Sequence, residues 1–408
     1  MRQEFDVVFA GAGPVGTVAA SLLAARRVSA PARIAVIDPR FAREGDGADW
    51  DLRVFALNHA SRRLLRAAGV WQRLPRERIS PYEHMCVWDA SGEPGGRRSL
   101  SFDCAELGEP DLGCIVDGRS LKWHALQAAR EAGITMIEAG VRAITVDEGA
   151  VRVRLDDGRD LGARLIAAAD GAQSPVRELL GVRTSGHDYG EDALVFHVRT
   201  QSEHRRTAWQ RFLASGPLAF LPLADGRSSI VWSVCHREAA RLRSLEPGAL
   251  AAALDEASAG VLGRTQVASA IAAFPLRLRT AECLAGERFA LLGDAAHVVH
   301  PLAGQGLNLG LMDCAAFVEV LEDAGGAAAF GDLRVLRRYE RWRRSEIGPS
   351  SAAFDGLDRL FSNADSRLST LRGAGLEVVG SIGPLRRWFA ARALGTSGDL
   401  PRMLRGRG

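Results

Sequence analysis

The 408-residue sequence lacks most of the features that indicate a secreted, membrane-spanning or nucleic-acid-binding protein. Its six cysteines are scattered, with no Cys-x-x-Cys pair and no metal-ligand spacing, so we expect reduced thiols. No apolar run reaches the length of a transmembrane helix. Acidic and basic side chains nearly cancel at a net charge of +3, which provides no strong attraction for a polyanion. Nucleic acid is therefore not an expected partner.

Motifs for hydrolysis and for metal binding are also missing. There is no G-x-S-x-G elbow, no P-loop and no pair of acids set for glycoside hydrolysis. His297 and His300 lack the spacing and the acid of H-E-x-x-H, so we expect packed or hydrogen-bonded histidines and no metal site. The first strand pattern begins within five residues of the N-terminus, which leaves no room for an export signal. We expect a cytoplasmic protein, with attachment to a membrane surface left open.

The sequence does contain a glycine turn between two apolar strand patterns, within residues 5–38. Gly11 permits a tight turn, Gly13 lets the backbone approach a pyrophosphate, and Gly16 lets a helix lie close on the strand. Asp38 ends the second strand, where its carboxylate can accept hydrogen bonds from a ribose. An ordinary glycine turn is the alternative, but the flanking strands and the spaced acid favour dinucleotide binding.

Two further strand ends carry a glycine beside an acid. In residues 161–180, Asp170 follows an apolar strand, and it can either order the loop or contact a nucleotide. In residues 289–311, Asp294 also follows a strand, and a glycine-rich loop then begins a helix near Asn308. Asp294 could bind a sugar-alcohol chain, and the helix could direct its N-terminal amides at an electron-rich ring carbonyl, which favours a flavin. The alternative is a glycine turn capped by an aspartate.

These segments together resemble the FAD-dependent aromatic hydroxylases, the class A flavoprotein monooxygenases. The resemblance rests on four stretches: GAGPVG, DLRVFALNHAS at 51–61, ADGAQSPVR at 169–177 and GDAAHVVHPLAGQGLNLG at 293–310. More narrowly, DLRVFAL, WQRFLASGPLAFLPL, VWS and HPLAGQGLNLGL resemble the ubiquinone-biosynthesis hydroxylases. The sequence departs from that pattern at Asp38, where many relatives have Glu, at Glu191 in place of Gln, and at Met312 in place of Arg.

The resemblance implies an α/β fold. A Rossmann-like FAD-binding domain is expected at 1–79, 115–182 and 281–345. It would be interleaved with a substrate-binding β-sheet domain at 80–114 and 183–280. Residues 346–408 would form a helical C-terminal region.

The resemblance also implies which residues bind a tight, non-covalent FAD. The first glycine loop and Asp38 would hold the ADP part of FAD, and Asp294 would hold the ribitol. Arg53 and Arg119 would contact the flavin. The alternative for Arg53 is an arginine in a solvated loop. No catalytic side chain is assigned with certainty, but a loop facing the flavin is expected at Pro301, Gly304, Gln305 and Gly306. The expected cofactor-binding residues are Gly11, Gly13, Pro14, Val15, Gly16, Asp38, Arg53, Arg119, Asp170, Asp294, Gly304, Gly306, Leu307 and Asn308.

The activity implied by the resemblance is hydroxylation of a polyprenylated phenol or benzoquinol precursor of ubiquinone, with O2 and a transient NAD(P)H co-substrate. Hydroxylation of a soluble aromatic compound and a low-activity flavin-binding scaffold in a quinone-biosynthesis complex are the alternatives. The segment 384–394 combines basic and apolar residues, so it could rest on a membrane, dock on partner proteins or simply pack on the core. An apolar substrate pocket is expected, with these candidate wall residues, although residues of this kind are more often plain core: Phe196, Phe212, Phe220, Leu221, Pro222 and Trp232.

Overall fold

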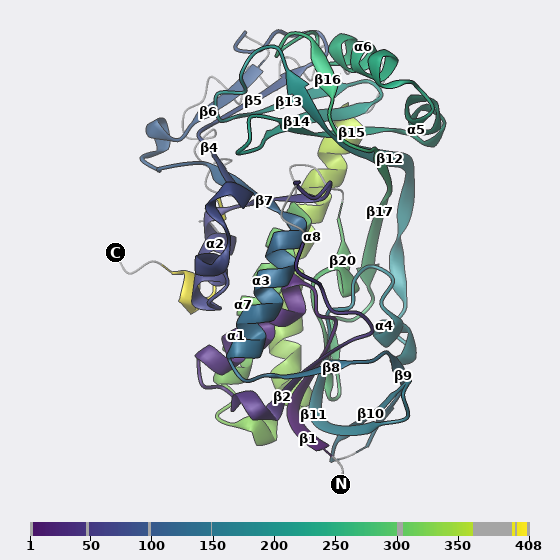
Figure 1. Cartoon of the computed structure of the whole chain (residues 1–408). Coiled ribbons are helices and arrows are strands. Elements are labelled where there is room, and N and C mark those ends of the chain that lie inside the picture. Colours follow the sequence, from purple (N-terminus) through teal and green to yellow (C-terminus); the bar gives the residue numbers. More distant parts are fainter. Residues whose placement is uncertain are drawn as a thin grey trace.

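The computed structural model describes residues 3–45, 49–96, 99–147, 149–299, 305–361, 394–395 and 398–405. In this part of the chain, two large sheets lie one above the other (Figure 1), and a small sheet contacts elements of both. None of the described helices is both long and apolar enough to cross a membrane. The helices are α1 (Pro14–Ala25), α2 (His59–Ala67), α3 (Gly118–Glu131), α4 (Pro175–Leu179), α5 (His236–Arg243), α6 (Pro247–Ala257), α7 (Gln305–Glu322) and α8 (Leu333–Phe361).

The lower sheet is mostly parallel and forms the nucleotide-binding half. Its central strand, β1 (Gln3–Ala10), ends in an apolar run at residues 7–10 that is buried on both faces, as expected where helices cover a parallel sheet. The strand order is β18 (Ala285–Gly286), β19 (Phe289–Leu291), β11 (Asp160–Ala168), β1 (Gln3–Ala10), β2 (Ile34–Asp38) and β8 (Thr135–Glu138), with β10 (Val151–Leu155) and β9 (Val141–Val146) paired beside β11. The parallel strands end at one edge, so the loops after β1, β11 and β19 are neighbours.

The upper sheet is mostly antiparallel, and α5 and α6 pack on one of its faces. Its strand order is β20 (His297–Val298), β17 (Ala272–Ala281), β12 (Thr184–Thr200), β15 (Ser228–Cys235), β14 (Gly216–Pro222), β13 (Thr207–Leu213), β5 (His84–Asp89) and β6 (Ser99–Asp103), with β16 (Thr265–Val267) beside β12. The small sheet consists of β3 (Val54–Leu57), β7 (Gly113–Asp117) and β4 (Ile79–Tyr82). The other face of the upper sheet is directed toward the nucleotide-binding half.

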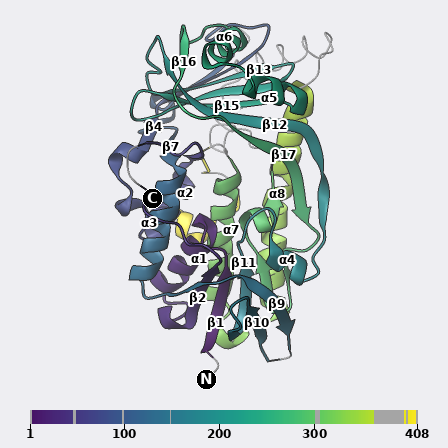
Figure 2. The same ribbon diagram turned by 45° about the vertical axis from the view of Figure 1, so that its right-hand side comes forward.

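The predicted Rossmann-like α/β fold is confirmed, and the longest described helix is α8 (Leu333–Phe361). Figure 2 shows that this helix, α8, runs beside α7 from the lower sheet toward the upper one. Because α8 continues through residues 345 and 346, the boundary predicted there falls inside a helix. The division of the chain into the domains given above remains a prediction, and most of residues 362–408 lie outside the described part.

Glycine allows α1 and α7 to pack closely at the edge where the loops meet. A Cβ built on Gly310 of α7 would lie 2.8 Å from Val15 Cγ2 and 3.2 Å from Gly293 Cα. The nearby Cys314 thiol donates to the carbonyls of Val15 and Gly310, each at 3.2 Å. Any side chain at position 310 would therefore push α7 away from α1 and from the loop after β19.

We expect Gly310→Val to lower the free energy of unfolding by about 1–3 kcal/mol, because it overpacks this contact. Gly248→Val is the matched control, since a Cβ at Gly248 in α6 would meet nothing within 4 Å. Denaturant unfolding of both variants measures the difference. A similar loss in the two variants would contradict the role of close helix packing.

Candidate active site

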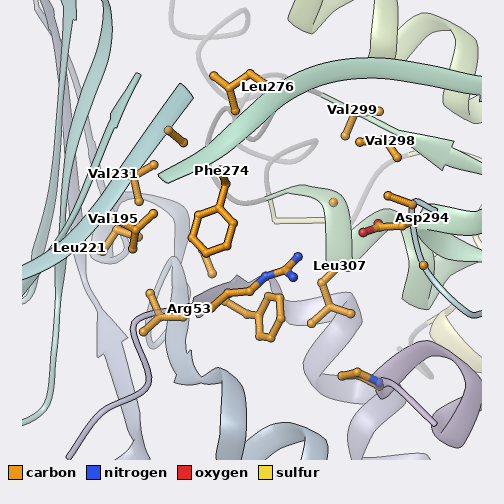
Figure 3. A pocket seen from close by; sticks show the side chains of 18 of the residues that line it. Arg53, Val195, Leu221, Val231, Phe274, Leu276, Asp294, Val298, Val299 and Leu307 are labelled. Carbon is orange, nitrogen blue, oxygen red and sulfur yellow. The ribbon is translucent and has the colours of Figure 1, made fainter. Parts of the chain in front are cut away.

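A cavity of about 680 Å³ lies between the two large sheets. Figure 3 shows part of its lining, with Asp294 and Leu307 on one side, Val195, Leu221 and Val231 on the other, and Arg53 and Phe274 between them. Its lining includes these sequence-predicted residues: Gly11, Gly13, Pro14, Val15, Asp38, Arg53, Asp170, Asp294, Gly306, Leu307 and Leu221. Residues predicted from separate motifs are thus brought together in one place.

The first glycine turn has the geometry expected of a phosphate-binding loop. Gly11 has φ +106°, and a Cβ there would lie 2.3 Å from the carbonyl oxygen of Ala169. A Cβ on Gly16 would lie 2.0 Å from the Gly11 carbonyl oxygen, whereas a Cβ on Gly13 would meet nothing within 4 Å. No side chain caps α1, so its first-turn N–H groups remain available to an anion.

Asp38 lines the cavity and also holds the first turn in place. One of its oxygens accepts a hydrogen bond from the Ala12 amide at 2.8 Å, and the other accepts one from the Arg40 amide at 2.9 Å. A carboxylate has about four lone-pair sites, so two backbone bonds leave capacity for a ribose hydroxyl.

Asp170 orders its own loop, which is one of the two roles that the sequence left open. Its carboxylate accepts hydrogen bonds from Ser174 Oγ and, at 3.0 Å, from the Val176 amide, and burial raises its pKa. It also lines the cavity, so contact with a ligand is still open to it.

Arg177 was not predicted, although it lies within the ADGAQSPVR stretch. Its buried guanidinium donates to the Ala295 carbonyl at 3.0 Å and to the Ala172 carbonyl at 3.1 Å. It therefore joins the loop after β11 to the loop after β19. The position of this arginine, a few residues after a glycine-acid turn, indicated that it lies near the site. The sequence could not predict which groups its side chain contacts.

Asp294 differs from the other two acids because, within the described residues, its carboxylate has no hydrogen-bond or ion-pair partner. It lies in the short turn Gly293–Ala295 directly after β19, and Figure 3 shows it at the cavity beside Val298. A partly buried carboxylate without a protein partner is suited to bind a ligand hydroxyl.

The two predicted arginines are placed differently. Arg53 lines the cavity, with its guanidinium carbon 5.3 Å from the centre of the Phe55 ring. Arg119 instead lines a smaller neighbouring pocket with Gly45 and Asp51, and Lys122, one turn further along α3, lines both pockets. The structure therefore puts Arg53 in the main cavity and Arg119 beside it.

The loop predicted to face the flavin is only partly described. Pro301 and Gly304 lie outside the described residues, and Gln305 is the first residue of α7. The Asn308 side chain is not in the cavity lining: its amide donates to the Ala56 carbonyl at 2.8 Å, and its oxygen accepts from the Asn58 amide at 3.1 Å and from Ser61 Oγ at 2.6 Å. Asn308 thus attaches α7 to β3 and to the start of α2.

A buried cluster of ionisable groups that the sequence did not predict lies behind Asp294. Asp313 of α7 accepts hydrogen bonds from His297 Nε2 at 2.7 Å, from Arg343 Nε at 2.6 Å and from the Gly293 amide at 2.8 Å. The side chains of Asp313, His297 and Arg343 are all at most 2% exposed. The prediction that His297 is a hydrogen-bonded histidine is confirmed.

Most of the predicted pocket-wall residues are in the wrong place. Phe196, Phe220 and Trp232 belong to the core beneath α5 and α6, and Phe212 and Pro222 are not part of the cavity lining either. Side chains alternate between the two faces of a strand, and Phe196, Phe220, Pro222 and Trp232 have the opposite phase to the lining residues of their strands. The residues on these strands that line the cavity are Ala193, Val195, Ala208, Trp209, Gln210, Pro217, Ala219, Leu221, Val231 and Ser233.

Comparison with known proteins decides the family. The FAD binding domain family matches residues 4–345. The chain belongs to this family. Ubiquinone hydroxylase UbiL of Rhodospirillum rubrum is 35% identical over 409 residues, covering 98% of this chain and 92% of that protein. The 3-demethoxyubiquinol 3-hydroxylase of Escherichia coli is 32% identical over 351 residues, covering 85% and 88%.

A solved structure agrees with this assignment. The structure of pqsL, a probable FAD-dependent monooxygenase from Pseudomonas aeruginosa, superposes with a TM-score of 0.70 at 26% identity and covers 91% of this chain and 99% of that one. The resemblance to the ubiquinone-biosynthesis hydroxylases is confirmed. The chain is a FAD-dependent monooxygenase, and the uncapped start of α1, the open space at Gly13 and the unpartnered Asp294 fit FAD.

We expect Asp313→Asn to lower the free energy of unfolding of this flavoprotein by about 3–5 kcal/mol, because it leaves the buried Arg343 without its charge partner. Burial alone would raise the pKa of Asp313, but His297 and Arg343 outweigh it and the net pKa is below its usual value. The pKa of this carboxyl group is about 4 in the unfolded protein and lower in the folded protein, so the ionised carboxylate stabilises the fold at pH values above about 4. This stabilisation is lost as the pH falls through the folded-state pKa. The variant should therefore show a weaker loss of stability below about pH 4.

Denaturant unfolding between pH 3 and pH 7 tests this prediction. Asp323→Asn is the control, because its partners Arg338 and Arg402 are about half exposed and such pairs contribute less than about 1 kcal/mol. Equal losses in the two variants, or an unchanged pH profile for Asp313→Asn, would contradict the prediction.

Proposed function

We propose that this enzyme uses NAD(P)H and O2 to hydroxylate the aromatic ring of a polyprenylated phenol or benzoquinol in ubiquinone biosynthesis. The observation that carries the proposal is the continuity of the cavity, which extends from the nucleotide-binding turns of the lower sheet to an apolar face of the upper sheet. The names of the two relatives, a ubiquinone hydroxylase and a demethoxyubiquinol hydroxylase, support this choice of substrate.

The lining of the cavity favours a neutral, largely apolar substrate. The cation on the upper sheet that lines the cavity, Arg277 of β17, is paired with Asp188 at 3.0 Å. None of the lining residues on β12, β13, β14 and β15 is charged, so these four strands offer no partner for an aromatic carboxylate. Several of them are alanine, which leaves room for a ring. Phe274 also lines the cavity and is 41% exposed, so an apolar surface continues to the outside of the protein where a prenyl tail could leave.

The lower half of the cavity would hold FAD, which when bound supplies the redox chemistry with O2. In this proposal the turn at Gly11–Gly16 and the start of α1 bind the pyrophosphate, and Asp38 binds a ribose hydroxyl. Asp294 binds the ribityl chain, and Gly306 and Leu307 lie at the ring. The apolar strands exclude water from the reacting centre.

Membrane contact and partner proteins are a further part of the proposal. The segment 384–394, which suggested such contact, lies outside the described residues. Flotation with anionic liposomes, comparing the full chain with a variant in which the basic residues of this segment are changed to Glu, would test it. Unchanged flotation would remove the membrane role of this segment.

The function is tested with purified, FAD-loaded protein. We expect NAD(P)H oxidation to be stimulated by a prenylated quinol such as 3-demethoxyubiquinol, with one oxygen atom incorporated into its ring and detected by mass spectrometry. Stimulation only by short soluble phenols would indicate a hydroxylase of soluble aromatics. FAD binding without turnover of either class would indicate a scaffold.

We expect Asp294→Ala to weaken FAD binding by about 10- to 100-fold, since a hydrogen bond to a charged group contributes about 1.5–3 kcal/mol. Quenching of flavin fluorescence measures the dissociation constant. Riboflavin, which carries the ribityl chain, should lose affinity by the same factor, whereas ADP should not. Asp157→Ala, in an exposed turn, is the control. Equal loss for ADP would show that Asp294 does not act on the ribityl chain.

A further inference from the structure

Two polar side chains interrupt the apolar strand face that lines the cavity. Gln210 on β13 is 8% exposed and Ser233 on β15 is 2% exposed, and both line the cavity. Across the described residues, neither side chain forms a hydrogen bond within the protein. Their polar atoms are not among the fully buried, unpartnered atoms of the described residues, so they are open to the cavity and can be reached by a ligand in it.

The strand register places the two polar groups on either side of one apolar patch. Gln210 pairs with Ala219, and Ala219 pairs with Val231. Adjacent strands are about 4.8 Å apart, so Gln210 lies about 10 Å from Val231 across the sheet. Ser233 is the next residue after Val231 on the same face of β15. A ring that lies on Ala219 and Val231 would therefore have Gln210 near one edge and Ser233 near another.

The chemistry of these two groups suits neutral oxygen substituents. An amide and a hydroxyl can each donate and accept, so they can bind a ring hydroxyl, methoxy or carbonyl oxygen. A carboxylate would instead require a cation, and the lining residues of these strands include none. We propose that Gln210 and Ser233 hydrogen-bond the oxygen substituents of the substrate ring and so fix which ring carbon faces the flavin side of the cavity.

This inference rests on the proposed function and adds the residues that select the substrate. Ser229 provides a matched comparison, because it is on the same strand and the same face as Ser233 but does not line the cavity. Its hydroxyl is fully buried and without a partner. A loss that is specific to Ser233 would therefore report contact with the ligand rather than the removal of any buried hydroxyl from β15.

The test is equilibrium dialysis of the FAD-loaded protein with two probes: a short-tailed 3-demethoxyubiquinone and an arene with the same tail but no ring oxygen. We expect Gln210→Met and Ser233→Ala each to raise the dissociation constant of the quinone by about 3- to 10-fold, with no change for the oxygen-free arene. Ser229→Ala should leave both constants unchanged. Gln210→Leu replaces Gln210→Met if the latter does not fold.

Several outcomes would overturn the inference. The inference is wrong if neither Gln210→Met nor Ser233→Ala loses affinity for the quinone, or if the affinity for the quinone and for the oxygen-free arene falls equally. It is also wrong if Ser229→Ala loses as much quinone affinity as these variants, or if the wild-type protein does not bind the quinone. Failure of the proposed function is seen separately, as an absence of NAD(P)H-dependent ring hydroxylation by a wild-type protein that does bind the quinone. In turnover, the variants should also release more H2O2 per NAD(P)H oxidised, because a ring that is held less firmly is oxygenated less often.

Discussion

The buried carboxylate of Asp313 is the interaction on which the site depends. It accepts hydrogen bonds from the loop after β19, through Gly293 and His297, and from α8, through Arg343. Because all three partners are buried, a lost bond would leave an unpaired polar group in the interior. The position of Asp294, one residue beyond Gly293, is therefore fixed from inside the protein, and its own carboxylate remains available to a ligand.

The same edge of the sheet is held together by further contacts between its loops. Arg177 joins the loop after β11 to Ala295, and the Ala169 amide at the start of that loop donates to the Ala10 carbonyl at the end of β1 at 2.7 Å. Three turns that are far apart in the sequence thus form one rigid surface around the cavity. Preorganisation of this kind reduces the ordering cost of binding a large cofactor, because the loops do not have to be fixed at the moment of binding.

What the sequence predicts depends on how local the signal is. The turn at Gly11–Gly16 and its acid Asp38 were predictable because a glycine turn, two strands and a helix occur within about 30 residues. The Asp313–Arg343 pair was not, because 30 residues separate an ordinary aspartate from one arginine among many. Asn308 shows the same limit: its position near the loop was predictable, but the direction of its side chain depends on packing against β3 and α2.

The misplaced pocket wall has a physical reason that also explains the cavity. The predicted wall consisted mostly of large apolar side chains. On β12, β14 and β15 these side chains are on the face covered by α5 and α6, where Phe196, Phe220 and Trp232 fill a core. The opposite face has Ala193, Ala219 and Ser233 at the intervening positions. Small residues cannot fill the space between two sheets, so a cavity is left beside the nucleotide-binding loops. A shift of one residue in strand register would exchange the two faces and close the site.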